Sequence, residues 1–129
     1  MRSLNSVELI GNLTRDPELT KTNNNTSVCN FNVATDRSWT TAEGEKKEET
    51  EFTRVIAWQK LAEICGAMLW KGSKVYISGR LLTRKFTGQD GVEKTSTEVV
   101  CNDMICLSPK KEVVEEKVKE KVEEKVDKV

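Results

Sequence analysis

The chain has 129 residues, of which 36% are hydrophobic, and its 21 basic residues balance 21 acidic ones. This length suits one domain with a modest core, and the neutral charge excludes the overall basic excess of a generic nucleic-acid binder. The sequence lacks an apolar run of about 18 residues and a basic N-terminus followed by an apolar segment. We therefore expect neither a membrane span nor a signal peptide, but a cytoplasmic protein.

Motifs for catalysis and metal binding are also missing. The chain has no histidine, and its cysteines have no CxxC spacing, so the sequence predicts reduced, buried thiols and no metal site. Neither a GxxxxGK(S/T) nor a GxGxxG loop is present, and no imidazole can activate a cysteine. We expect no enzymatic activity and no cofactor. The cysteines are Cys29, Cys65, Cys101 and Cys106.

The N-terminal third predicts two strands. Apolar residues from Val7 to Leu13 indicate the first strand, which the turn Arg15-Asp16-Pro17 ends. Gly11 interrupts it, as a glycine does at a bulge or sharp bend of a small barrel. After the turn Asn23-Asn24-Asn25, apolar and polar residues alternate with the period of a half-buried strand. The two alternating sets are Cys29, Phe31, Val33 and Thr35 against Asn30, Asn32 and Ala34.

The middle of the chain changes period. The segment from Ser38 to Lys47 has few large apolar residues, which indicates a long hairpin loop before a third strand from about Glu49 to Trp58. An apolar stripe with helical spacing predicts a helix of about three turns, with Gly72 as its C-terminal cap. The residues of this stripe are Leu61, Ile64, Cys65, Met68 and Leu69.

Two further strands complete the domain. Lys74 to Phe86 and Thr95 to Leu107 have strand character, and Gln89-Asp90-Gly91 predicts the hairpin turn between them. Three strands, one helix and two strands is the order of the OB-fold, a five-stranded, partly open Greek-key barrel that binds ligands on its second and third strands and loops. The sequence therefore predicts an all-β OB-fold with one short helix.

Aromatic and basic residues are interleaved between Glu51 and Phe86. From Thr53 to Phe86 there are seven Lys or Arg residues against Glu63, whereas the flanking segments are acidic. Rings that stack on bases, together with cations that follow phosphates, bind single-stranded nucleic acid with little sequence preference. Salt screens interactions between exposed charges beyond about 8 to 10 Å. A local basic stripe can therefore attract a nucleic acid although the whole chain is neutral. The alternative is that the rings belong to the core and the cations to an ordinary surface.

Four segments, in this order, resemble bacterial single-stranded DNA-binding proteins. They are VELIGNLTRD at Val7 to Asp16, TEFTRVIAWQKLAE at Thr50 to Glu63, KGSKVYISGRLLTRKF at Lys71 to Phe86, and TEVVCN at Thr97 to Asn102. The resemblance covers residues 4 to 107. It implies an OB-fold subunit, usually of a homotetramer, that binds single-stranded DNA during replication, recombination and repair at the nucleoid.

The resemblance also implies which residues bind DNA. The aromatic set, which would stack on bases, is Trp39, Phe52, Trp58 and Phe86, and the basic set, which would contact phosphates, is Arg54, Lys60, Lys71, Arg84 and Lys85. The family commonly has tryptophan in place of Phe52 and phenylalanine in place of Trp58, and both exchanges keep a ring face for stacking. Tyr76 and Trp70 stay outside the set, because Tyr76 can pack within a strand and Trp70 stands where the family often has a cation.

Two features depart from the family pattern. Thr53 stands where the family often has a histidine near a subunit interface, which leaves the stability of a tetramer open. Family tails end in an acidic tip with Pro-Phe that recruits replication and repair enzymes. This chain instead ends in KKEVVEEKVKEKVEEKVDKV, with seven Lys against seven acidic residues. The acidic hook is absent, which puts the usual recruitment in doubt.

The chain thus divides into an OB-fold domain over residues 1–109 and a charged tail over residues 110–129. Mixed charge and few large apolar residues predict a mobile or transiently helical tail. Two alternative functions stay open. One is an OB-fold that binds single-stranded RNA or tRNA, because rings and cations suit either sugar. The other is an interaction module in which the charged tail docks a partner.

Overall fold

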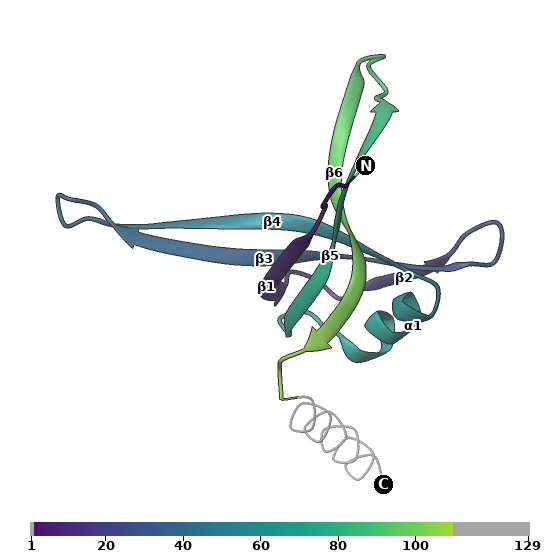
Figure 1. Ribbon diagram of the computed structural model, residues 1–129, viewed down its shortest axis with the longest axis horizontal. Helices are drawn as coiled ribbons and strands as arrows, with labels where there is room; N and C mark the ends of the chain where they lie inside the picture. Colours follow the sequence, from purple (N-terminus) through teal and green to yellow (C-terminus); the bar gives the residue numbers. More distant parts are fainter. Residues whose placement is uncertain (1, 110–129) are drawn as a thin grey trace, which may run out of the picture.

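The computed structural model describes residues 2–109, which form a β-barrel with one helix and projecting hairpins (Figure 1). The strands and the helix follow the predicted order, with one additional short strand. Their bounds are β1 Val7–Leu13, β2 Glu18–Lys21, β3 Ser27–Thr40, β4 Lys46–Trp58, α1 Gln59–Met68, β5 Lys74–Thr87 and β6 Glu93–Cys106.

Five of these strands close the barrel. The strands are hydrogen-bonded in the order β1-β5-β6-β4-β3-β2, and β1 also pairs with β3, where Leu13 lies opposite Val33. β4 and β6 run parallel over a short contact, with Val55 opposite Val99, and the other pairs are antiparallel. This closed arrangement, with α1 between β4 and β5, confirms the predicted OB-fold.

The short strand β2 is absent from the sequence prediction. It pairs antiparallel with the start of β3, from Glu18 opposite Asn30 to Lys21 opposite Ser27. All four of its side chains are exposed, so no alternation of apolar and polar residues marks it in the sequence. The predicted asparagine turn joins the two strands, and Asn25 takes a φ of 62° there, a conformation that asparagine tolerates better than most residues.

The core fills the barrel and continues under α1. Alternation along β3 turns Cys29, Phe31 and Val33 inward, as the sequence predicts. Burying an apolar side chain of this size stabilises the fold by about 1.5 to 3 kcal/mol. Residues from the other strands and from α1 complete the same cluster, namely Leu13, Val55, Ala57, Ala62, Cys65, Leu69, Val75, Ile77, Val99 and Cys101.

The helix departs from the prediction at two points. It ends at Met68, and Gly72 lies in the turn that follows, where φ is 90° and its N–H donates to the Leu13 carbonyl at 2.9 Å. The predicted apolar stripe includes Ile64, but Ile64 is 38% exposed and Ala62 is fully buried instead. The small Ala62 side chain lets α1 approach the barrel closely, and this turns Ile64 toward solvent.

Gly11 and Gly79 lie where two strands come too close for a side chain. A Cβ at Gly11 would overlap the backbone oxygen of Ala34 on β3, and a Cβ at Gly79 would overlap that of Val100 on β6. The register of β1 on β5 is unbroken from Val7 to Asn12, so a bulge at Gly11 is wrong. The shift in register lies between Ser78 and Gly79. A bulge there bends the β5–β6 hairpin as it leaves the barrel.

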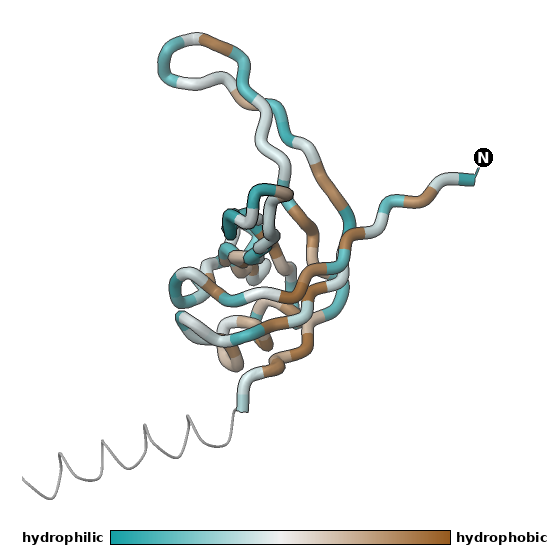
Figure 2. The backbone as a smooth tube through the Cα atoms, turned by 90° about the vertical axis from the view of Figure 1, so that its left-hand side faces the viewer, coloured by the Kyte–Doolittle hydropathy of each residue, from teal (hydrophilic) through white to brown (hydrophobic). Residues whose placement is uncertain are grey.

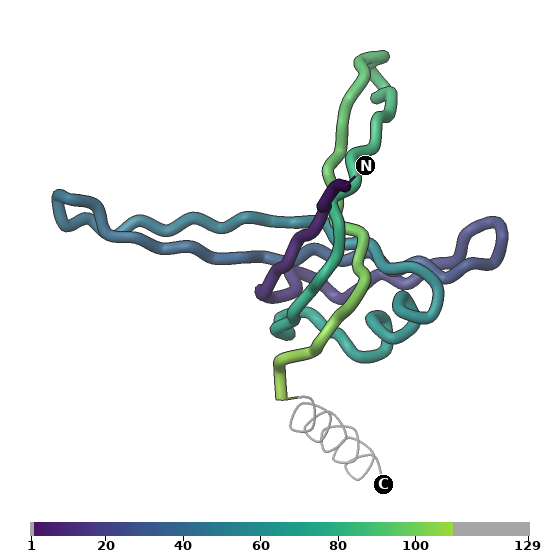
Figure 3. Tube along the Cα trace, viewed as in Figure 1, coloured from purple at the N-terminus to yellow at the C-terminus, as the bar shows by residue number. Residues whose placement is uncertain are grey.

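The β3–β4 and β5–β6 hairpins extend beyond the barrel (Figure 3). β3 and β4 stay paired as far as Thr40 and Lys46, so the loop predicted from Ser38 to Lys47 is half strand, and the turn is confined to residues 41–45. The prediction fails because both faces of this arm meet solvent and carry polar residues. Figure 2 shows hydrophobic segments mainly where the strands meet in the barrel. The β5–β6 hairpin runs to Thr87 and Glu93 around the predicted turn.

The cysteines are free thiols, three of them buried and Cys106 half-buried. Burial raises the pKa of Cys29 to about 11. A hydrogen bond with Cys101 raises the pKa of Cys65 and lowers that of Cys101. Because the thiolate is the reactive form, Cys29 and Cys65 are inert at neutral pH. The charged tail, for which mobility or transient helix is predicted, lies outside the described residues.

Candidate nucleic-acid interface

The outer face of β4 carries three of the predicted site residues. Val55 and Ala57 point into the core, so alternation turns Phe52, Arg54 and Trp58 outward. The rings of Phe52 and Trp58 are 65% and 46% exposed. With a rise of about 3.3 Å per residue, they lie roughly 20 Å apart along the strand, with Arg54 between them. Exposure on this scale contradicts the alternative in which these two rings belong to the core.

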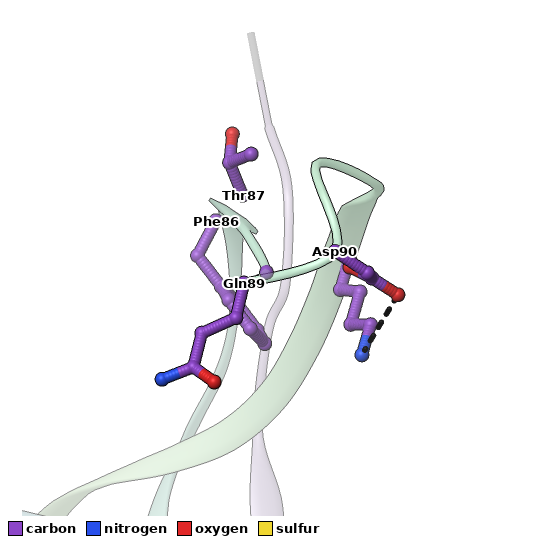
Figure 4. A pocket seen from close by; sticks show the side chains of 6 residues that line it. Phe86, Thr87, Gln89 and Asp90 are labelled. Carbon is purple, nitrogen blue, oxygen red and sulfur yellow. Dashed lines mark ion pairs between the residues drawn. The ribbon is translucent and has the colours of Figure 1, made fainter.

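The β5–β6 hairpin carries the second group. Phe86 lies opposite Lys94 near the hairpin tip and is 49% exposed, and Arg84 lies opposite Ser96. Figure 4 shows Phe86, Thr87, Gln89 and Asp90 around a hollow of about 570 Å³ at this tip, with an ion pair between Asp90 and Lys94 at 3.9 Å. The pairing of β5 with β6 up to Thr87 and Glu93 places Phe86 at the surface near this tip.

A second hollow joins the two groups. It has a volume of about 340 Å³ and is lined by Arg54 of β4 and by Arg84, Lys85, Phe86 and Ser96 of the β5–β6 hairpin. The structure therefore places Arg54 beside Arg84, Lys85 and Phe86, which lie about thirty residues further along the sequence. A base against Phe86 would place its flanking phosphates within reach of these cations.

Arg54 also lines a third hollow, of about 180 Å³, on the other side of β4. Its other lining residues are Arg15, Asp16, Glu18, Asn30, Phe31 and Asn32. Asp16 accepts a hydrogen bond from the backbone N–H of Lys71 at 2.7 Å, which places Lys71 beside this hollow. Arg54 thus lies between the two hollows, and the path along them mixes the basic Arg15 and Arg54 with the acidic Asp16 and Glu18. Arg15, Asn30 and Asn32 are absent from the predicted site, because the turn after β1 brings Arg15 to this path and the pairing of β3 with β4 brings the two asparagines.

Beneath Arg54 and Arg84 lies a buried acidic residue. Glu98 of β6 is 0% exposed. Its Oε1 accepts hydrogen bonds from Nε of Arg84 at 2.7 Å and pairs with Nη2 of the same residue at 2.6 Å. Its Oε2 lies 3.7 Å from Nε of Arg54 and accepts no hydrogen bond from the described residues. In the sequence, Glu98 stands out only as one residue of an acidic flanking segment.

Two predicted residues lie apart from this face. Trp39 is half-buried on the β3–β4 arm, where the guanidinium of Arg37 lies 4.7 Å from its ring centroid. Alternation along β3 places it across the ribbon from Phe52, which is paired with Ala34. Lys60 is exposed in the first turn of α1. A cation near a helix N-terminus interacts unfavourably with the helix dipole. Lys60 therefore does not stabilise the helix.

Tyr76 and Trp70 lie outside the interface. The Tyr76 hydroxyl donates a hydrogen bond to Oε1 of Glu8 at 2.7 Å, and this bond raises the pKa of Tyr76. Trp70 is half-buried in the turn after α1, where its carbonyl accepts a hydrogen bond from the Ser73 hydroxyl at 2.7 Å. Neither residue lines the hollows around Arg54.

The fold and this face define an OB-fold domain with exposed rings and cations on one outer surface, as in the oligonucleotide-binding members of that fold. The chain belongs to the single-strand binding protein family, whose model matches residues 4–107.

Curated relatives agree with this assignment. The single-stranded DNA-binding proteins of Neisseria meningitidis serogroups A and B are 46% identical over 110 residues, which cover 85% of this chain. This chain spans 63% of the length of each. Single-stranded DNA-binding protein 1 of Chlorobaculum tepidum is 46% identical over 110 residues, covering 84% of this chain and 68% of that protein.

A solved structure has the same architecture. Plasmodium falciparum SSB in complex with ssDNA superimposes with a TM-score of 0.78 at 30% sequence identity, covering 84% of this chain and 98% of that one.

Proposed function

We propose that this protein binds single-stranded DNA with little sequence preference, as a binding protein rather than an enzyme, in replication, recombination and repair. The observation that carries the proposal is the outer face on which Phe52, Arg54, Arg84 and Phe86 gather. Exposed rings can stack on bases that a duplex would hide, and the cations can follow a flexible backbone. Family membership and the ssDNA bound to the Plasmodium protein support it.

The proposed contacts are those that the sequence predicts. Trp39, Phe52, Trp58 and Phe86 would stack on bases, and Arg54, Lys60, Lys71, Arg84 and Lys85 would bind phosphates. Arg15 joins the basic set, because it lines a hollow with Arg54. We place the protein in the cytoplasm, at the nucleoid. Its described residues contain no helix long and apolar enough to cross a membrane.

Salt titration tests the proposal. We expect tight binding of a fluorescein-labelled dT oligomer, weak binding of a duplex of equal length, and an affinity that falls as salt rises. Each neutralised phosphate on a single strand contributes about −0.7 to the slope of log K against log salt, so the six cations of the proposed basic set give about −4.2 per subunit. Equal affinity for the duplex, or no binding of dT, would contradict the proposal. A competition between poly(dT) and poly(U) decides between DNA and RNA, and preference for poly(U) would favour the RNA-binding alternative.

We also propose that the protein is a homotetramer. Ile10, Tyr76 and Ile105 lie in register across β1, β5 and β6, and the two isoleucines are 55% and 50% exposed. Contiguous apolar side chains on a sheet face are typical of a protein interface.

Light scattering of residues 1–109 should then give a tetramer at micromolar concentration. Ile105→Lys should lower the assembly state, because a charge would be buried against a neighbouring subunit. Val92→Lys is the matched control, since Val92 is 56% exposed at the far hairpin tip. A monomer from the unmodified domain would show the tetramer to be wrong.

The charged tail should contribute little to DNA affinity. It has no net charge and no aromatic residue, so neither stacking nor a net phosphate attraction is available to it. Deleting residues 110–129 should change the dissociation constant for dT by less than about threefold, below 1 kcal/mol. A larger loss, measured in the same titration, would show that the tail takes part in binding.

A further inference from the structure

Glu98 is unusual because its charge is buried. Its side chain is 0% exposed. Glu98 lies on β6, which pairs with β4, the strand of Arg54, on one side and with β5, the strand of Arg84, on the other. A carboxylate leaves water at a large cost in free energy unless cations and hydrogen bonds replace the water. Whatever holds Glu98 in place therefore has to include those two arginines.

The contacts of Glu98 leave much of each arginine free. Arg84 binds Oε1 through Nε and Nη2, at 2.7 and 2.6 Å, so its Nη1 group makes no contact with the carboxylate. Arg54 approaches Oε2 through Nε at 3.7 Å. The side chains of Arg54 and Arg84 remain 49% and 56% exposed. An arginine has five N–H donors in a planar fork, so both can bind Glu98 and an oxyanion at the same time.

The carboxylate of Glu98 also reduces the electrostatic repulsion between Arg54 and Arg84. Arg54 and Arg84 line one hollow, and two guanidinium groups this close repel each other. Glu98 lies between them with its negative charge and leaves the cluster with a net charge of one positive unit. The pair can then remain on the surface without a ligand, with both forks already oriented.

We propose that Glu98 is a positioning residue of the DNA interface, which holds Arg54 and Arg84 side by side so that their remaining donors meet adjacent phosphates of one strand. This inference rests on the proposed function. It goes beyond it, because the family resemblance places only the two cations at the interface. Preorganised side chains lose less conformational freedom on binding, which is how a buried negative charge can strengthen the binding of a polyanion.

A simple charge argument predicts the reverse. If Glu98 only neutralised the arginines, its removal would leave more positive charge at the surface, and DNA would bind more tightly with a steeper dependence on salt. The two explanations therefore differ in the sign of both measurements.

The experiment uses Glu98→Gln in the full chain, since glutamine keeps the shape and an acceptor oxygen but removes the charge. We expect dT to bind about tenfold more weakly. We also expect the salt slope to become shallower by about 1.4, because two phosphate contacts at about 0.7 each are lost. Tighter binding with a steeper slope, or an unchanged affinity and slope, would overturn the proposal. Circular dichroism confirms that the variant is folded.

A double-mutant cycle keeps the proposal testable if Glu98→Gln does not fold. Arg54→Gln and Arg84→Gln should have non-additive effects on dT affinity, because each loss disorders the other arginine through Glu98. Lys85→Gln is the matched control. Lys85 lies next to Arg84 in the sequence but has no described contact with Glu98. The effect of Lys85→Gln on dT affinity should therefore add to that of Arg54→Gln. Additive effects of the two arginines would overturn the proposal. Failure of the unmodified protein to bind dT would instead contradict the proposed function.

Discussion

Alanine at both Phe52 and Phe86 will weaken the binding of a dT oligomer by about 2 to 6 kcal/mol. Each ring that stacks on a base contributes about 1 to 3 kcal/mol, and the two effects should add because the rings lie on different elements, β4 and the β5–β6 hairpin. Both rings are about half exposed or more, so their removal leaves the core intact. The salt slope should stay unchanged, since stacking releases no counterions.

Fluorescence titration of the two single variants and the double variant measures these effects. Val92→Ala is the matched control, because it removes an exposed apolar side chain from the same hairpin but has no ring. Trp39→Ala is a separate test of the ring that lies across the ribbon. If folded Phe52→Ala/Phe86→Ala protein bound dT like the unmodified protein, the outer face of β4 would not be the interface.

The sequence predicts strands well where one face is buried. Cys29, Phe31 and Val33 alternate with polar residues because β3 has one side in the core there. Further along the same strand both faces meet solvent, and the alternation ends although the pairing continues to Thr40. The strand β2 is missed for the same reason, because all four of its side chains are exposed. Hydrophobic periodicity reports burial, so exposed pairs of strands escape it.

The interface was predicted in part. Rings and cations between Phe52 and Phe86 could be named because each has a chemistry that suits single-stranded nucleic acid. Their grouping around Arg54 depends on the lateral pairing of β4 with β6, which lies beyond any local pattern. Arg15 and Asn32 reach the same path through a turn and a neighbouring strand. Whether each named residue touches DNA stays a prediction.

The ion pair between Arg84 and Glu98 could be predicted from the sequence. The hairpin turn at Gln89-Asp90-Gly91 fixes the register of β5 on β6. This register places Leu82 opposite Glu98 and Arg84 two pairs further out, opposite Ser96. Diagonal partners two residues apart on one face are within reach of long side chains. The ion pair of Arg84 with Glu98 therefore follows from the turn. The burial of Glu98 does not follow from the turn, because it also depends on Arg54, which lies on β4.

Gly79→Ala should destabilise the fold by about 3 kcal/mol. The added Cβ would overlap the backbone oxygen of Val100 and contact Val99, and a backbone carbonyl within a sheet cannot move aside as a flexible side chain can. The register shift beside Gly79 also sets the direction of the hairpin that carries Arg84 and Phe86. We therefore expect weaker dT binding together with a fall in Tm of roughly 12 to 24 °C.

Gly66→Ala is the matched control, with the same added methyl group and the opposite expected sign. Its Cβ would lie 3.1 Å from Cδ2 and 3.3 Å from Cβ of Leu19, which is 46% exposed on the short strand β2, and we expect a small shift of that strand to relieve the contact. Replacing a glycine inside a helix by alanine stabilises it by up to about 1 kcal/mol, so Tm should stay level or rise slightly. Thermal melts followed by circular dichroism at one protein concentration compare the two variants. If both melted like the unmodified protein, the close approach of β5 and β6 at Gly79 would not be required by the fold.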